Sequence, residues 1–351
     1  MRFIHIADVH LGASPDAGSA YSKKRSSELW DALAEVVRTC RREETELLLV
    51  AGDLFHRQPL LRELKEVGGM FASLEKTKVV LIAGNHDYIR QDSYYRTFHW
   101  SSNVTMLKEE KLECAEFPEL NLAVYGLSYH SREIREARYE QERPRRRQKY
   151  EILLAHGGDE NHIPIHKAAL LAQGYDYVAL GHIHKPQVLE ENRMIYAGAL
   201  EPVDTADCGP HGYVKGELDE KGCRTEFVSS AGREYRQIRI AVDKAMTGFQ
   251  LREQICREIE AGGTQNIYKV RITGYRDPEI RFDLSGMDVY GNIVEMSDET
   301  KPAYAFEKLL MQNEENLLGS YIKSFLGAEE NSVEYQALCL GVRALIDTRA
   351  E

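Results

Sequence analysis

Histidine and carboxylate side chains recur in this chain in short motifs beside glycine or asparagine. Six of the twelve histidines lie in five such motifs, which are Asp8-Val9-His10, Gly52-Asp53-Leu54-Phe55-His56, Gly84-Asn85-His86-Asp87, Ala155-His156-Gly157-Gly158 and Gly181-His182-Ile183-His184. Imidazole, carboxylate and amide donors without thiolate suit manganese, iron or zinc. A single catalytic ion needs only three or four protein ligands. The larger set predicts two ions that share a carboxylate, clamp a phosphate and activate a water, which is the chemistry of phosphoester hydrolysis.

Each motif follows a run of β-branched and aliphatic residues that predicts a strand. The expected strands cover residues 2–7, 46–51, 78–83, 121–126, 150–155, 175–180 and 194–197. Apolar residues at helical spacing predict helices over residues 26–42 and 60–74. Strands that alternate with helices are typical of a layered α/β fold. In such folds the loops that leave the carboxyl ends of the strands converge on one crevice, so we expect the motifs to meet there.

The pattern changes after Gly232. Before it, a hairpin is expected over residues 212–218 and 225–228; after it come a strand over 236–242, a helix over 248–260, a strand over 267–273 and mostly helical sequence from residue 302. We therefore expect a main domain over residues 1–232, a small β-α-β domain over 233–300 and a C-terminal helical segment over 301–351.

Composition excludes several classes of protein. With 351 residues, 43% hydrophobic and 29% charged, the chain is an ordinary globular sequence and neither fibrous nor disordered. It shows no membrane span, no signal-peptide pattern at Met1 and no spaced cysteine pairs, so we expect a cytoplasmic protein without a membrane partner. A net charge of −11 opposes general attraction to a polyanion, so a nucleic-acid partner requires a local patch or bound cations.

The ordered motifs resemble the calcineurin-like metallophosphoesterase superfamily over roughly residues 1–230. The segments 7–12 and 52–56 are similar to the SbcD-type DNA repair nuclease branch, including its short bacterial YhaO-like relatives. Protein phosphatases of the superfamily carry aspartate where this chain has His56, which disfavours that branch. The resemblance implies an α/β fold, namely a layered α/β/β/α sandwich, followed here by a small C-terminal α+β unit and helices.

The resemblance also implies roles for individual residues. One ion would be held by Asp8, His10, Asp53 and His184, and the other by Asp53, Asn85, His156 and His182, so that Asp53 bridges them. His86 would protonate the leaving group or stabilise the transition state, Asp87 would orient His86, and His56 would help to place the scissile strand. Family members of this type use manganese.

Residues outside the motifs are candidates for substrate contact. His211 lies in a Gly-Pro-His-Gly turn, and Arg145 and Arg146 belong to a basic run over residues 143–149. His162 and His166 are further candidates to border the pocket. The alternative for each histidine is an ordinary surface position, and for the basic run a solvated loop.

We therefore expect a manganese-dependent dinuclear phosphodiesterase that hydrolyses DNA. The alternatives are a small-nucleotide phosphodiesterase or phosphatase that uses the same site, and a non-catalytic scaffold. By resemblance, the C-terminal helices would dock on an SbcC-type coiled-coil ATPase, although they could instead pack on their own domain. A homodimer is also compatible with the sequence, and since the chain has no P-loop, any ATP dependence would come from a partner.

Overall fold

The computed structural model of the chain describes residues 1–141, 143–329 and 332–348. It forms two compact units, Met1–Arg236 with Gln265–Ile267, and Gln237–Thr264 with Tyr268–Glu351. The expected boundary at residue 232 and the division at residue 300 stay predictions. Within the expected C-terminal segment, residues 330–331 and 349–351 lie outside the described residues.

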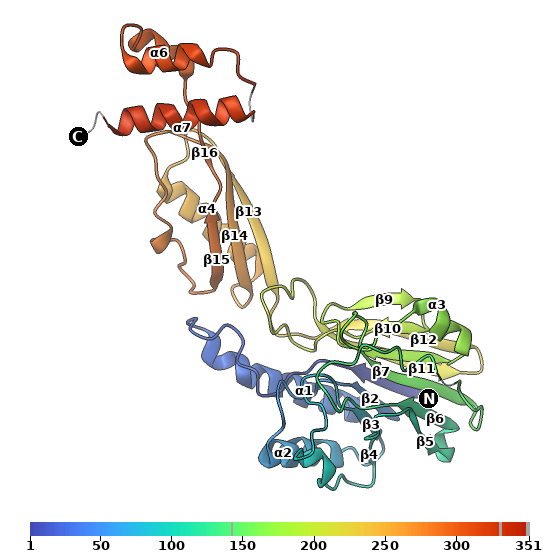
Figure 1. Cartoon of the computed structure of the whole chain (residues 1–351). Coiled ribbons are helices and arrows are strands. Elements are labelled where there is room, and N and C mark those ends of the chain that lie inside the picture. Colours follow the sequence, from blue (N-terminus) through green and yellow to red (C-terminus); the bar gives the residue numbers. More distant parts are fainter. Residues whose placement is uncertain (142, 330–331, 349–351) are drawn as a thin grey trace. The chain divides into compact units, whose positions relative to one another are not determined.

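Two six-stranded sheets form the centre of unit 1 (Figure 1). The first has the order β12-β11-β1-β2-β3-β4, with bounds Gly222–Ser229, Gly212–Asp219, Arg2–Ile6, Leu47–Ala51, Lys78–Ile82 and Val104–Met106. The second has the order β5-β6-β7-β8-β10-β9, with bounds Glu113–Phe117, Leu122–Gly126, Tyr150–His156, Tyr177–Gly181, Met194–Tyr196 and Gln187–Glu190. β1, β2, β3 and β4 pair in parallel, as do β6, β7 and β8.

Alternating side chains of the strands separate the core into layers. Phe3, Leu47 and Leu49 of the first sheet share one buried cluster with Ile152 and Leu154 of the second, so the two sheets pack face to face. The residues that alternate with these along the strands of the first sheet have their side chains on its other face, toward helices α1 (Ser22–Arg42) and α2 (Leu61–Ala72). On the far side of the second sheet, α3 (Lys167–Gln173) packs through Leu170. The expected α/β/β/α sandwich is confirmed.

Every strand and helix expected in unit 1 is present, although several of their ends differ from the expected ones. α1 begins at Ser22, four residues before the expected start. β4, β5, β9 and α3 were not expected, because runs of three to seven residues carry little periodic signal. β4, for example, is stabilised by its pairing with β3, where Val104 lies opposite Val79.

Unit 2 contains a small sheet with one long helix against it and three helices after it. Its strands are β13 (Tyr235–Val242), which crosses the boundary between the units, β14 (Ile267–Arg276), β15 (Ile293–Asp298) and β16 (Lys301–Pro302). α4 (Gly248–Gly262) begins with a capping box between Thr247 and Gln250. It buries Leu251, Ile255 and Ile259 against the sheet. The expected helical C-terminus consists of α5 (Phe306–Gln312), α6 (Leu317–Ser324) and α7 (Val333–Asp347).

Three short 3-10 helices complete the described elements, at Tyr94–Arg96, Pro118–Leu120 and Leu284–Gly286. Among the helices of the described residues, none combines the length and the apolar character that crossing a membrane requires.

Candidate metal centre

The carboxyl ends of the parallel strands bring all seven predicted ligands to one edge of the sandwich. Asp8, Asp53 and Asn85 follow β1, β2 and β3, while His156 ends β7 and His182 follows β8. The loops are joined by backbone hydrogen bonds, including Asp8 N to Gly52 O at 3.2 Å and His10 N to Asp53 O at 3.0 Å. The two sheets meet at the site, because His156 Nδ1 lies 2.9 Å from the carbonyl oxygen of Ala51.

Several ligand positions have a backbone conformation that side-chain-bearing residues rarely adopt. The φ angles of Asp8, His10 and Asp53 are 49°, 50° and 49°, and that of His182 is 96°. Such strain concentrates at functional sites, where the surrounding structure holds it in place. The strand exits therefore aim these side chains inward at some cost in backbone energy.

The first group of donors contains two imidazoles that face each other. His184 Nδ1 lies 3.1 Å from the carboxylate of Asp207 and donates to it, so Nε2 is the nitrogen left for a metal ion. That nitrogen lies 2.9 Å from His10 Nε2. His10 Nε2 lies 3.9 Å from Asp53 Oδ2, and the ligand atoms of Asp8, His10 and His184 lie within 4.8 Å of one another.

The second group converges on the side-chain oxygen of Asn85. His156 Nδ1 donates to the Ala51 carbonyl, so Nε2 is the nitrogen that faces the site, and this atom lies 2.8 Å from Asn85 Oδ1 and 3.5 Å from Asp53 Oδ2. His182 Nε2 lies 2.7 Å from Asp159 Oδ2 and donates to it. The other nitrogen, His182 Nδ1, lies 3.1 Å from the same Asn85 oxygen.

The donor chemistry of both groups fits divalent cations. Lone pairs that face each other at hydrogen-bonding distance repel unless a proton or a cation lies between them. The donors are nitrogen and oxygen atoms, as manganese, iron and zinc prefer. Asp53 lies beside both groups, so the residues fit two ions with Asp53 between them; the assignment of each ligand stays a prediction.

Burial and neighbouring charges shift the pKa values of the donors in opposite directions. Burial raises the pKa of Asp8 to about 6, although the charge of His156 opposes this shift. Burial lowers the pKa of His182 to about 4, and the charge of His156 adds to that effect. Burial would also lower the pKa of His156, but the charges of Asp53 and Asp8 and the hydrogen bonds to Asp53 and to the Ala51 carbonyl together outweigh burial and raise that pKa to about 9. Metal binding at neutral pH would therefore displace a proton from His156.

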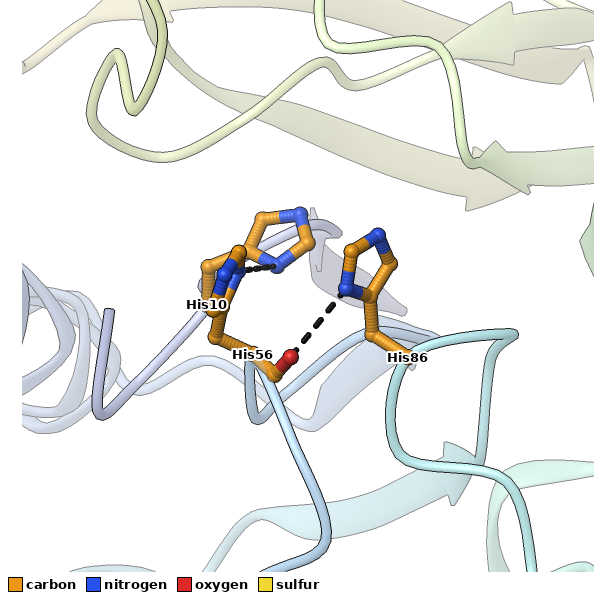
Figure 2. Close-up of side chains that lie close together, drawn as sticks. All are labelled: His10, His56 and His86. Atoms are coloured by element: carbon orange, nitrogen blue, oxygen red, sulfur yellow. Dashed lines mark hydrogen bonds between the residues drawn. The ribbon is translucent and has the colours of Figure 1, made fainter. Parts of the chain in front are cut away.

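Three histidines lie together at one side of the site, as Figure 2 shows: His10 is buried, His86 is half-buried and His56 is exposed. The Nδ1 atoms of His10 and His56 lie 3.3 Å apart. His86 Nδ1 lies 3.1 Å from the carbonyl oxygen of His56, while the backbone N–H of His86 donates to Asp53 Oδ1 at 2.9 Å. The two predicted catalytic histidines are thus brought beside the metal donors.

Asp87 has a different environment from the one expected. Its carboxylate is buried and accepts from Gly84 N, Phe55 N and Tyr95 Oη at 2.8, 3.2 and 2.8 Å. The ring of His86 is oriented instead by the carbonyl of His56. Burial, with the charge of Asp53, raises the pKa of Asp87 to about 7. Asp87 therefore joins the loops after β2 and β3, and its action on His86 stays a prediction.

Two carboxylates that orient ligands were missed by the sequence analysis. Asp159 accepts from His182 and also from His162 Nδ1 at 2.9 Å, and Asp207 accepts from His184. A carboxylate on the far nitrogen of a ligating histidine fixes its tautomer and ring orientation. Asp159 follows the two glycines after His156, which was the one available signal; Asp207 lies in a loop without a recognisable pattern.

The predicted substrate contacts lie in different places. His211 is buried, with Nδ1 3.0 Å from Gly209 O, and burial lowers its pKa. Arg145 and Arg146 precede β7, whereas His156 ends it, so the two arginines lie at the opposite end of that strand from the metal donors. Arg146 forms an ion pair with Asp176 at 3.0 Å. Contact of these three residues with substrate stays a prediction.

Comparison with known proteins gives consistent matches. A family model described as calcineurin-like phosphoesterase matches residues 1–186. YhaO of Bacillus subtilis, named an uncharacterized metallophosphoesterase, is 30% identical over 61% of this chain and 56% of its own length. The proteins named DNA double-strand break repair protein Mre11 are more distant. The Methanopyrus kandleri protein is 27% identical over 58% of this chain and 49% of its own length. The Archaeoglobus fulgidus protein is 25% identical over 95% of this chain and 88% of its own length. The chain thus spans about half the length of the first two relatives.

Proposed function

The chain belongs to the calcineurin-like phosphoesterase family, and from this we propose that it is a dinuclear, manganese-dependent nuclease that hydrolyses phosphodiester bonds of DNA. The observation that carries the proposal is the rim formed by His56 and His86 beside the metal donors. An exposed imidazole at His56 can contact a strand that enters the site from solvent. The names of the Mre11 relatives support DNA as the substrate.

In this proposal the chain provides two sets of ligands and a proton donor. When bound, two divalent ions would supply positive charge to hold the phosphate and to activate a water. Asp53 would lie between them, and the backbone N–H of His86 holds its Oδ1 in place. Asp159 and Asp207 keep His182 and His184 in the tautomers that leave a lone pair toward the site.

His86 is the residue that would assist the leaving group. Its Nδ1–H is bound to the carbonyl of His56, so a proton held on Nε2 is the one that it can give to the departing alkoxide. His86 is half-buried at the rim of the site, where a substrate strand can reach it.

In the same proposal, the C-terminal helices bind a partner protein. Large apolar side chains are exposed on these helices and in the loop after α6, namely Met311, Leu317, Leu326, Val333 and Leu340. Exposed apolar side chains suit contact with an apolar helical partner, and we assign this role to an SbcC-type coiled-coil ATPase. Such a partner would also bring the P-loop that this sequence lacks.

A comparison of two substrates tests the proposed activity. The purified chain with Mn²⁺ is incubated with bis-p-nitrophenyl phosphate and with end-labelled single- and double-stranded DNA, using the chelated protein as control. We expect hydrolysis of both substrates, abolished by the chelator. Hydrolysis of the small ester alone would favour the small-nucleotide phosphodiesterase, and hydrolysis of neither would favour a scaffold.

A further inference from the structure

Unit 2 contains a cavity of about 660 Å³ that is separate from the metal donors. It lies where β14 and β16 end, and α5 and α7 contribute to its walls. Figure 1 shows α7 lying across this end of the unit 2 sheet. The volume is within the usual range of small-molecule sites, about 300–1,000 Å³.

The charge of the cavity is opposite in sign to that of the whole chain. Its lining includes five cationic side chains but only three acidic ones, and the cations are Lys244, Arg276, Arg281, Lys308 and Arg343. Asp347 is shared by Arg281 and Arg343, at 3.5 and 3.8 Å. Within the described ranges, Lys244 and Lys308 form no ion pair. A positive cavity in a chain of net charge −11 is a local feature that composition does not predict.

Arg276 is the strongest indication of an anionic ligand. The residue is only 8% exposed. Its Nη1 donates to the carbonyl oxygens of Asp277 and Ile280 at 3.2 and 2.7 Å. Nε and Nη2 have no acceptor, and the guanidinium no carboxylate partner, among residues 1–141, 143–329 and 332–348. Both nitrogens are accessible to solvent and Arg276 lines the cavity, so a bound anion would supply the counter-charge that the guanidinium lacks.

The walls indicate what the rest of the ligand is like. Tyr304, Leu309 and Ile346 present apolar surface from the core of the C-terminal helices. Arg276 is held against this wall by the pairing of β14 with β16 and by the hydrogen bond from Ala303 N to Arg276 O at 2.8 Å. The planar guanidinium group of arginine can donate two parallel hydrogen bonds to phosphate oxygens, whereas the ammonium group of lysine acts as a point charge.

We propose that this cavity binds a small phosphate ester of mononucleotide size, with its phosphate on Arg276 and its organic part against Tyr304, Leu309 and Ile346. Lys244 and Lys308 at the rim add charge toward the phosphate. The site is independent of the metal centre and does not rest on the nuclease proposal.

Calorimetric titration of the full chain tests the site. Adenosine 5′-monophosphate is titrated in the presence of a chelator, so that metal ions make no contribution, with adenosine and inorganic phosphate as comparison ligands. We expect saturable binding of the nucleotide, tighter than that of inorganic phosphate, and no measurable binding of adenosine. Absence of saturable nucleotide binding, or equal binding of adenosine, would overturn the proposal, as would binding of a DNA oligonucleotide alone.

Variants locate the binding within the chain. Arg276→Gln should weaken nucleotide binding at least about tenfold, because a charge-assisted contact to phosphate is lost. Since Arg276 also holds its own loop, the double variant Lys244→Ala with Lys308→Ala provides a second test on exposed residues, with an expected loss of about fivefold or more. Lys323→Ala, exposed on α6 and outside the cavity, is the matched control and should bind like the wild type. Unchanged affinity in both cavity variants would contradict the assignment.

Discussion

At the scale of single residues, a variant of His86 can distinguish an effect on metal binding from an effect on catalysis. It touches Asp53 only through its backbone N–H, so His86→Gln should leave the bound metal unchanged. Turnover should fall about 10²-fold or more, because the proton for the leaving group is lost. Metal analysis and steady-state kinetics measure the two quantities, and His99→Gln at an exposed position is the control. Full activity of His86→Gln would remove this residue from the mechanism.

Asp159 tests whether carboxylates behind the ligands matter. The variant Asp159→Asn keeps the size of the side chain but loses the charge that holds His182 Nε2–H at 2.7 Å. Metal affinity should fall about 10- to 100-fold, as is usual for such outer partners. Competition with a fluorescent chelator gives the affinity. Glu160→Gln, at the exposed neighbouring position, should bind metal like the wild type; an equal affinity in Asp159→Asn would show that His182 needs no orienting carboxylate.

At the scale of elements, the tight packing of the strand exits leaves no room at Gly84. A Cβ atom there would lie 2.2 Å from Asp53 Oδ1 and 2.7 Å from His156 Nε2. Gly84→Ala should therefore push the metal donors apart, lower metal content and destabilise the fold by about 1–3 kcal/mol. Thermal unfolding and metal analysis check both effects.

Gly69→Ala is the matched control, because Gly69 lies within α2 and a Cβ there would meet no atom within 4 Å. Alanine favours helix over glycine by up to about 1 kcal/mol, so this variant should be as stable as the wild type or more so. If Gly84→Ala also behaved like the wild type, the close packing of the loops after β2 and β3 would be contradicted.

The lengths and burial of the elements also explain which parts of the site could be predicted from the sequence. The strands before Asp8, Asp53 and Asn85 are buried aliphatic runs, so their positions and the convergence of the motifs follow from local pattern and the parallel topology. The partners Asp159 and Asp207 could not be inferred in this way. Each contacts a histidine 23 residues away through an irregular loop, and such contacts depend on the tertiary fold.

At the scale of the whole molecule, the charge distribution limits how DNA could bind. The basic run before β7 is engaged with acidic neighbours, since Arg146, Arg147 and Lys149 pair with Asp176, Glu116 and Glu220. A net charge of −11 gives no general attraction for a polyanion. In the proposed nuclease, DNA affinity would therefore come from the metal centre and from a partner.

The count of bound metal ions tests the central claim, that Asp53 joins two metal positions in one site. The full chain and Asp53→Ala are loaded with Mn²⁺, dialysed and analysed for metal per chain, with Asp92→Ala at an exposed position as control. The account predicts two equivalents in the wild type and in the control, and loss of both in Asp53→Ala, because the shared ligand is gone. Two tightly bound equivalents retained by Asp53→Ala would contradict it.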